Sequence, residues 1–161
     1  QEMIMLIIPI NKGFFIKIDD EDFDRVTQKH WIVEERQNTC YASTPLFNEK
    51  GSARIRLHRF ILKLEGPFPH VDHKNGNGLD CQKENLRTAT VRQNGCNYTR
   101  PVGKTGYRGV ALKDGRYYAK IRTPSGTRKS IGGFNTAEEA AKCYDEAAKL
   151  YHGEFATLNF I

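Results

Sequence analysis

Side chains that could act together on a phosphate gather in the stretch 71–97. Asp72 and His73 are adjacent and precede a turn rich in Gly and Asn, while Asn85 and Asn94 come later. The oxygens of Asp72 and Asn94 are hard ligands of the kind that Mg²⁺ takes, with water and substrate phosphate filling the rest of its shell. An ordinary histidine pKa lies near neutrality, so His73 beside such an ion could take a proton from water. The stretch therefore predicts a metal-assisted hydrolase of phosphodiesters.

The backbone must bend for these residues to converge. Neighbours in a regular strand point to opposite faces, so Asp72 and His73 can reach one site only where a strand ends or bends. The sequence KNGNG at 74–78 supplies the bend, because Gly and Asn accept positive φ. The capping-box pattern at 90–93 predicts a short helix with Asn94 on about its first turn. The prediction depends on the joint pattern, because an Asp-His pair in a loop usually has no catalytic role.

The elements before this stretch are expected to be rich in β-structure. In chain order we expect a hairpin over 3–18 turning at Asn11-Lys12-Gly13, a short helix over 19–26 with Phe23 and Val26 inward, a hairpin over 30–42, a polar turn at 48–51, and a half-buried strand over 54–60. In that last strand, Arg54, Arg56 and His58 would form the exposed face.

The C-terminal region has a different pattern. A linker is expected over 98–104, followed by three short strands separated by turns at 113–115 and 123–126. Thr136 and Glu139 form a capping-box pattern that predicts a helix running to about His152 and ending at Gly153. Alanines and tyrosines along one face of this helix would let it lie close to the sheet. The predicted fold class is α+β, with domains at 1–97 and 105–161.

Charge is distributed unevenly along the chain. The 161 residues carry a formal net charge of +6, are 39% hydrophobic and could form one domain or two small ones. Residues 1–50 hold six Lys/Arg against nine Asp/Glu, whereas residues 82–132 hold twelve against two. This asymmetry favours a polyanionic partner, with nucleic acid as the leading candidate and a merely solvated basic face as the alternative.

The cysteines and the apolar runs exclude other classes of protein. Because the four cysteines form no C-x-x-C pair, we expect no structural zinc, and a distant pairing of Cys81 and Cys96 is the weak alternative. We recognise no signal peptide and no apolar span of about 20 residues, so we expect no membrane partner and reduced thiols in a cytoplasmic setting.

A dense set of short motifs runs through 57–97: LHR at 57–59, VDH at 71–73, NG at 75–76, LD at 79–80, ENLR at 84–87 and T-x-x-QN at 90–94. This segment resembles HNH endonucleases of the phage and homing type. The resemblance implies a ββα-metal core in which Asp72 and Asn94 bind Mg²⁺ or Mn²⁺, His73 is the general base and Asn85 braces the loop that carries the histidine. It also implies a setting near the nucleoid of a bacterial or phage-infected cell.

Two histidines and several arginines near this core have open roles. His58 is interpreted first as a structural or phosphate-contacting residue, with direct catalysis as the alternative, and His70 as a surface histidine or an accessory donor. The basic residues expected to contact DNA here are Arg54, Arg56, Arg59, Arg87 and Arg92.

The segment 105–161 resembles an AP2 DNA-binding domain, through YRGV at 107–110, A-x-IR at 119–122, G-x-F at 132–134, TAEEAA at 136–141, YD at 144–145, Gly153 and Asn159-Phe160. The resemblance implies that the sheet lies in the major groove, which is wide enough to admit strands. Arg108 and Arg122 match the contacting positions best, and the further candidates are Lys113, Arg116, Lys120, Arg128 and Lys129. Because the strands lack the tryptophans of the plant pattern, the family's target site is not transferred.

Together these features predict a site-specific, metal-dependent DNA endonuclease. The alternative is a DNA-binding regulator that keeps a nuclease-like fold without cleaving, and an RNA-binding or protein-interaction module is weaker because RRM and KH signatures are lacking. The target site, nicking or double-strand cleavage, monomer or homodimer, the physiological metal and the native start before Met3 are left open.

Overall fold

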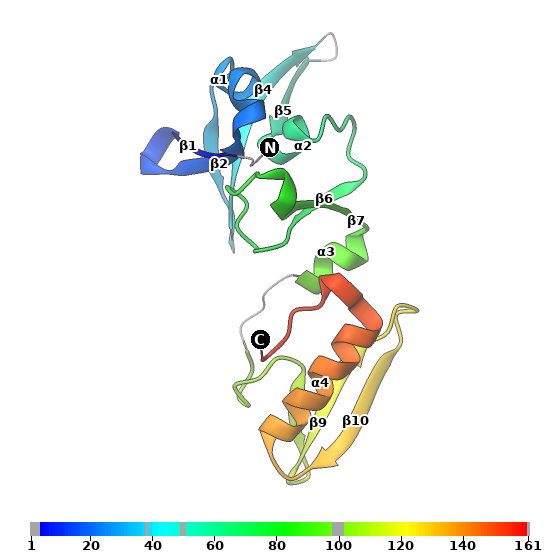
Figure 1. Ribbon diagram of the computed structural model, residues 1–161. Coiled ribbons are helices and arrows are strands. Elements are labelled where there is room, and N and C mark those ends of the chain that lie inside the picture. The colour runs from blue at the N-terminus through cyan, green and yellow to red at the C-terminus, as the bar shows by residue number, and fades with distance from the viewer. Residues whose placement is uncertain (1–3, 38, 49–50, 98–101, 161) are drawn as a thin grey trace. The chain divides into compact units, whose positions relative to one another are not determined.

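The computed structural model describes residues 4–37, 39–48, 51–97 and 102–160 (Figure 1). The chain forms two compact units, residues 1–91 and 92–161, and each combines strands with helices, as the predicted α+β class requires. In this division the helix α3 (Val91–Asn97) falls almost wholly in the second unit. Positions 98–101 of the predicted linker lie outside the described residues, and the domain bounds inferred from the sequence stay a prediction. No helix in the described ranges is both long and apolar enough to span a membrane.

The first unit begins with a hairpin of β1 (Met5–Pro9) and β2 (Phe15–Asp19) around the short 3₁₀ turn η1 (Asn11–Gly13), as predicted. A second 3₁₀ turn, η2 (Asp20–Asp22), leads into α1 (Phe23–Thr27). Val26 is fully buried, but the prediction for Phe23 was wrong, since this ring is 42% exposed. The reason is that Asp22, buried and paired with Arg25 at 2.8 Å, shares the inner face with Val26 four residues later.

The central sheet of the first unit has the order β3-β4-β5, formed by β3 (Ile32–Glu35), β4 (Cys40–Asn48) and β5 (Gly51–Arg56). The hairpin expected over 30–42 is confirmed, while positions 49–50 of the expected polar turn lie outside the described residues. The strand predicted over 54–60 ends at Arg56, because the helix α2 (Leu57–Ile61) begins at the next residue. Leu57 and Ile61 have the i, i+4 spacing of a helix face, and both are buried.

The candidate site lies on a short hairpin of β6 (His70–His73) and β7 (Leu86–Ala89), joined by a loop that contains the 3₁₀ turn η3 (Lys83–Asn85). This loop is fastened to the N-terminal part of the unit. The Lys83 backbone N–H donates to Asp19 at 2.8 Å, and its ammonium pairs with Glu21 at 2.6 Å and Asp22 at 3.2 Å. Cys81 donates its backbone N–H to the Lys17 carbonyl at 2.8 Å. These bonds tie the site loop to β2 and η2, and Leu79, Cys81 and Leu86 of the same region are buried in the hydrophobic core of the unit.

The second unit has a three-stranded antiparallel sheet in the order β10-β9-β8, with one long helix packed on it (Figure 1). Its elements are β8 (Val110–Lys113), β9 (Arg116–Arg122), β10 (Arg128–Phe134), α4 (Ala137–His152) and the 3₁₀ turn η4 (Gly153–Phe155). The predicted capping box of Thr136 and Glu139 is present, and the helix ends at the predicted residue. Tyr144 and the helix alanines are buried against Ala119 and Ile121 of the sheet.

The end of the chain returns to the start of this unit. Asp145 on α4 accepts the backbone N–H of Asn159 at 2.8 Å and that of Phe160 at 2.9 Å. The Asn159 side chain accepts the backbone N–H of Arg108 at 2.6 Å. These bonds fix the segment that enters β8, and hence the backbone at Arg108.

Candidate functional site

Asp72 and His73 occupy the end of β6, and both side chains are buried. Asp72 is paired in register with Arg87 of β7, so the two side chains lie on the same face of the hairpin. The Arg87 guanidinium donates to Asp72 Oδ2 from Nε at 2.8 Å and from Nη2 at 2.7 Å. Arg87, which the sequence assigned to DNA contact, therefore has its guanidinium on the candidate metal ligand and is only 11% exposed.

The chain bends directly after His73, as the Gly/Asn sequence predicted. Gly76 has a φ of +75°, and its N–H donates to the His73 carbonyl at 2.8 Å. Asn85 is buried behind this turn: its side-chain oxygen accepts the Asn75 N–H at 3.0 Å, and its amide donates to the Asp80 carbonyl at 2.7 Å. Asn85 thus ties together both ends of the loop that follows the histidine.

The His73 imidazole lies among other aromatic rings. Its centroid is 5.0 Å from that of His58, in an edge-to-face arrangement, and 5.9 Å from that of Tyr41. Its Nε2 is 3.9 Å from the Sγ of the fully buried Cys81, whose thiol pKa is raised by burial. The site is therefore enclosed by β4, α2 and the loop after β6.

Burial controls the protonation of the two histidines. It lowers the pKa of His73 to about 4, against an opposing effect of the Asp72 and Asp80 carboxylates. It lowers the pKa of His58 to about 3, and the charges of His73 and Arg56 act in the same direction. Both rings are accordingly neutral at pH 7, and a neutral imidazole is the form that can accept a proton.

His58 was predicted on the exposed face of a strand, and this prediction was wrong. It is the second residue of α2, and its ring is turned into the site because the chain changes from strand to helix at Leu57. The DNA contact predicted for Arg59 stays a prediction; its guanidinium donates to three backbone carbonyls of the loop 65–69, at 2.5–3.3 Å. His70 lies half-buried at the start of β6, with its ring edge-on to Phe68.

Arg54 and Arg56 of the first unit, which were also predicted to contact DNA, have side chains 51% and 39% exposed. Both face Glu34 on β3, at 3.9 and 3.8 Å, so the pair lies along one side of the central sheet. The pKa of Glu34 is lowered by a hydrogen bond from Ser43 and by the nearby arginines. Arg56 also lies over the Tyr41 ring, with Cζ 4.6 Å from the centroid.

Asn94 and Arg92 lie on α3, with Asn94 half-buried and Arg92 exposed. Both belong to the second unit, and the pairing of Asn94 with Asp72 stays a prediction.

The donor chemistry of the first unit suits a divalent cation. Asp72 supplies a buried carboxylate, and Asp80 Oδ1 is buried without a hydrogen-bond partner in the described part of the chain. Hard oxygen donors of this kind match Mg²⁺ or Mn²⁺.

Two residues of the site, Tyr41 and Asp80, were assigned no role from the sequence. Tyr41 lies far upstream of the motif, and nothing in its local pattern distinguishes it from an ordinary strand aromatic. Asp80 was noted as part of the LD motif, but without a role; its carboxylate accepts from the Asn75 amide at 2.9 Å. The dense LHR and LD motifs were the available signal for His58 and Asp80.

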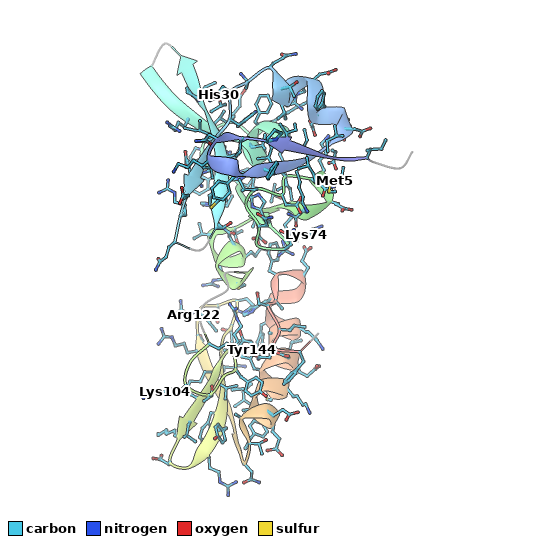
Figure 2. All side chains as sticks on the ribbon, turned by 90° about the vertical axis from the view of Figure 1, so that its left-hand side faces the viewer. Met5, His30, Lys74, Lys104, Arg122 and Tyr144 are labelled. Atoms are coloured by element: carbon cyan, nitrogen blue, oxygen red, sulfur yellow. The ribbon has the colours of Figure 1, made fainter. Side chains whose placement is uncertain are left out.

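The sheet of the second unit separates its basic residues by face. Ala119 and Ile121 face α4, so Arg116, Lys120 and Arg122, which alternate with them, face outward. Residues paired in register share a face, which adds Lys113 and Arg128 to this outer side. Arg122 and Tyr144 are labelled in Figure 2, where Tyr144 lies between α4 and the sheet.

Lys129 and Arg108 differ from these five cations. Lys129 is paired with Ile121 and therefore lies on the helix side, where its ammonium donates to the Tyr151 hydroxyl of α4 at 2.9 Å. Arg108 lies half-buried in the segment before β8 and donates to the Cys96 carbonyl at 3.4 Å. The outer face is thus formed by Lys113, Arg116, Lys120, Arg122 and Arg128, with Tyr118 among them.

Known proteins similar to this chain fall into two groups. A family model described as HNH endonuclease matches residues 56–96. Over 155 residues the chain is 36% identical to an uncharacterised HNH endonuclease of Acanthamoeba polyphaga mimivirus, and the alignment covers 93% of this chain and 77% of that protein.

The second group consists of plant proteins. The dehydration-responsive element-binding protein 2A of Arabidopsis thaliana is 50% identical over 56 residues, which are 34% of this chain and 17% of that protein. The protein of the same name from Oryza sativa subsp. indica is 48% identical over 124 residues, covering 68% of this chain and 44% of that protein. The chain spans less than half the length of either plant relative.

Proposed function

We propose that this chain, which belongs to the HNH endonuclease family, hydrolyses phosphodiester bonds in double-stranded DNA at preferred sites and requires a divalent metal ion. The observation that carries the proposal is the buried Asp72-His73 pair at the end of β6, with Asn85 tying together the loop behind it. A carboxylate and a neutral imidazole on adjacent residues can serve metal binding and proton transfer at a single phosphate.

In this proposal Asp72 and Asn94 would hold Mg²⁺ or Mn²⁺, which would stabilise the negative charge that develops on the phosphate and the leaving oxygen. Arg87 orients the Asp72 carboxylate through its two contacts with Oδ2. A buried, oriented carboxylate needs little rearrangement on binding a cation, which is the usual benefit of outer-shell support for a metal ligand.

His73 is assigned as the general base that takes a proton from the attacking water. Its ring is neutral at pH 7 because burial lowers its pKa to about 4. Its Nε2 lies 3.9 Å from the Sγ of the buried Cys81. Asn85 keeps the loop after His73 closed and so fixes the backbone from which the imidazole projects.

The second unit is proposed to bring the site to its DNA. Its C-terminal sequence resembles the AP2 domain, and the named plant relatives are element-binding proteins. The five outward cations of the sheet would contact phosphates and base edges, because the major groove admits strands.

A single nuclease site cuts one strand at a time, so a double-strand break would need a homodimer or two successive events. We also propose that the protein works in a reducing compartment that contains DNA.

The second candidate is a DNA-binding protein that does not cleave, which the similarity to plant element-binding proteins favours. One experiment separates the two. Supercoiled plasmid is incubated with the wild-type chain, His73→Ala and His30→Ala, with Mg²⁺, with Mn²⁺ and with EDTA. His30 is an exposed histidine of the same unit and serves as the matched control.

We expect metal-dependent nicked or linear product from the wild type and from His30→Ala. His73→Ala should lose about 10²–10⁴-fold in rate, the usual contribution of a general base, and should still shift DNA in a gel. Binding of one DNA sequence by wild-type protein that cuts no DNA under any of these conditions would overturn the proposal in favour of the non-cleaving regulator.

A further inference from the structure

Three aromatic rings meet around the proposed base, and each comes from a different element. Tyr41 is on β4, His58 on α2 and His73 on β6. The centroid distances are 5.0 Å between the two histidines, 5.6 Å between Tyr41 and His58, and 5.9 Å between Tyr41 and His73. Each ring thus packs against both others.

The Tyr41 ring is also fixed from outside this triangle. The loop after His73 presses Gly78 against it, since a Cβ at position 78 would lie 2.7 Å from Cδ1 of the tyrosine. Gly78 is held there by a hydrogen bond from its N–H to the Thr39 hydroxyl at 3.0 Å. The Arg56 guanidinium covers the ring at 4.6 Å. Tyr41 is therefore a rigid surface against which the site histidine packs.

The His73 imidazole needs such a surface. Rotation about χ2 of histidine is broad, because the torsion joins sp³ and sp² atoms, so the side chain alone does not choose a ring orientation. A base displaced by about 1 Å from its acceptor geometry can lose about 10²-fold in rate. In the described contacts, the neighbouring rings of Tyr41 and His58 pack against the imidazole and can hold this torsion.

We propose that Tyr41 and His58 are positioning residues that hold the imidazole of His73 in its reactive orientation through their ring contacts. The inference rests on the proposed role of His73. It adds Tyr41, which lies outside the residues that the family model matches, to the catalytic site. The tyrosine acts through the edge and face of its ring, so its hydroxyl is not required.

The test compares Tyr41→Leu with Tyr41→Phe in the full-length chain. Tyr41→Leu removes the ring and should lower the single-turnover cleavage rate about 10–100-fold without changing DNA affinity, since DNA binding does not depend on the orientation of the imidazole. Tyr41→Phe keeps the ring and should recover most of that loss. Phe60→Leu is the control for lost packing, because Phe60 is an aromatic residue of the same unit whose ring lies edge-on to Trp31 at 5.5 Å.

A double-mutant cycle distinguishes positioning from general destabilisation. In a His73→Ala background, Tyr41→Leu should have no further effect on the residual rate, because the ring that it positions is gone. An equal loss in both backgrounds, or a Tyr41→Leu variant as fast as a cleaving wild type, would overturn the inference. A Tyr41→Phe variant as slow as Tyr41→Leu would overturn it as well, because the hydroxyl would then be the active group.

A readout independent of cleavage keeps this inference separate from the proposed function. In NMR spectra of the uncut, metal-free chain, nuclear Overhauser contacts should join the Tyr41 ring protons to the His73 ring protons, and the His73 signals should shift in Tyr41→Leu. If wild type fails to cleave but these contacts are present, the proposed function fails while the ring packing stands. If wild type cleaves and the contacts are absent, the positioning role fails alone.

Discussion

At the scale of single residues, the buried His58 makes the stability of the first unit depend on pH. In an unfolded chain a histidine has a pKa of about 6.5. Burial, together with the charges of His73, Arg56 and Arg59, lowers the pKa of His58 to about 3 in the folded chain. Below pH 6.5 the unfolded state binds a proton that the folded state does not. The contribution of His58 to the free energy of unfolding is therefore fully present above pH 6.5 and is lost as the pH falls from 6.5 towards 3.

We predict that His58 alone lowers the free energy of unfolding by about 2 kcal/mol between pH 7.5 and pH 5, the value that follows from these two pKa values. Urea denaturation without divalent ions measures it. His58→Phe should lose this part of the pH dependence, and the exposed His30→Gln should keep it. Equal pH dependence in wild type and His58→Phe would show that His58 is not held as a neutral ring.

The residues that could be read from the sequence are those whose neighbours in the chain define them. Asp72 and His73 were placed at a strand end because Gly and Asn follow them, and the structure bends there. Tyr41 and Arg87 could not be placed in the same way. Their partners lie 32 and 15 positions away, and a tertiary contact over such a separation leaves no local periodicity to detect.

At the scale of elements, the bounds of a helix could be predicted from the sequence where several local features agreed. The bounds of α4 followed from a capping box at one end, a glycine at the other and small residues along one face, and all three agree. The prediction of the boundary between β5 and α2 was wrong, because the residues Arg54–Leu57 alternate like a strand while Leu57–Ile61 repeat like a helix. Leu57 satisfies both patterns, and tertiary packing decides between them.

The approach of β8 to α4 depends on the absence of a side chain at Gly109. Its φ is +69°, and a Cβ there would lie 2.1 Å from Cε2 of the buried Tyr144. Neither the backbone conformation nor the space admits alanine, because a positive φ is strained for L-residues and the ring of Tyr144 is enclosed by the core.

Gly109→Ala should therefore lower the free energy of unfolding of the second unit by more than about 2 kcal/mol. Thermal unfolding monitored by circular dichroism measures the effect. Gly103→Ala is the matched control, because a Cβ at position 103 meets nothing within 4 Å. A Gly109→Ala variant that melts with the wild type would contradict the close packing of this strand against the helix.

At the scale of the whole molecule, the net charge of +6 does not show where the individual cations lie. In the first unit, Arg59 donates to backbone carbonyls of the loop 65–69, and Arg87 pairs with the Asp72 carboxylate. The second unit instead presents five cations on one sheet face, and the strand register separates them from Lys129. The count of basic residues predicts a polyanionic partner, while the pairing of strands assigns each cation to a face of the sheet.

This sorting gives a test in which two similar changes should differ. Each cation that neutralises a phosphate contributes about 0.9 to the slope of log affinity against log salt concentration. Lys120→Ala combined with Arg122→Ala removes two outward cations and should reduce that slope by up to about 2, measured by fluorescence anisotropy with duplex DNA. Lys129→Ala removes a cation from the helix side and should leave the slope close to that of the wild type.

The same variants bear on how the two units share the work. If the sheet selects the site and the Asp72-His73 pair cuts, the double variant should still nick plasmid in the presence of metal but should lose its preference for particular positions. A double variant with unchanged affinity, salt slope and cleavage positions would remove the outer face of the sheet from DNA recognition. Site choice would then have to come from the first unit, where Arg54 and Arg56 are predicted DNA-contacting arginines with side chains 51% and 39% exposed.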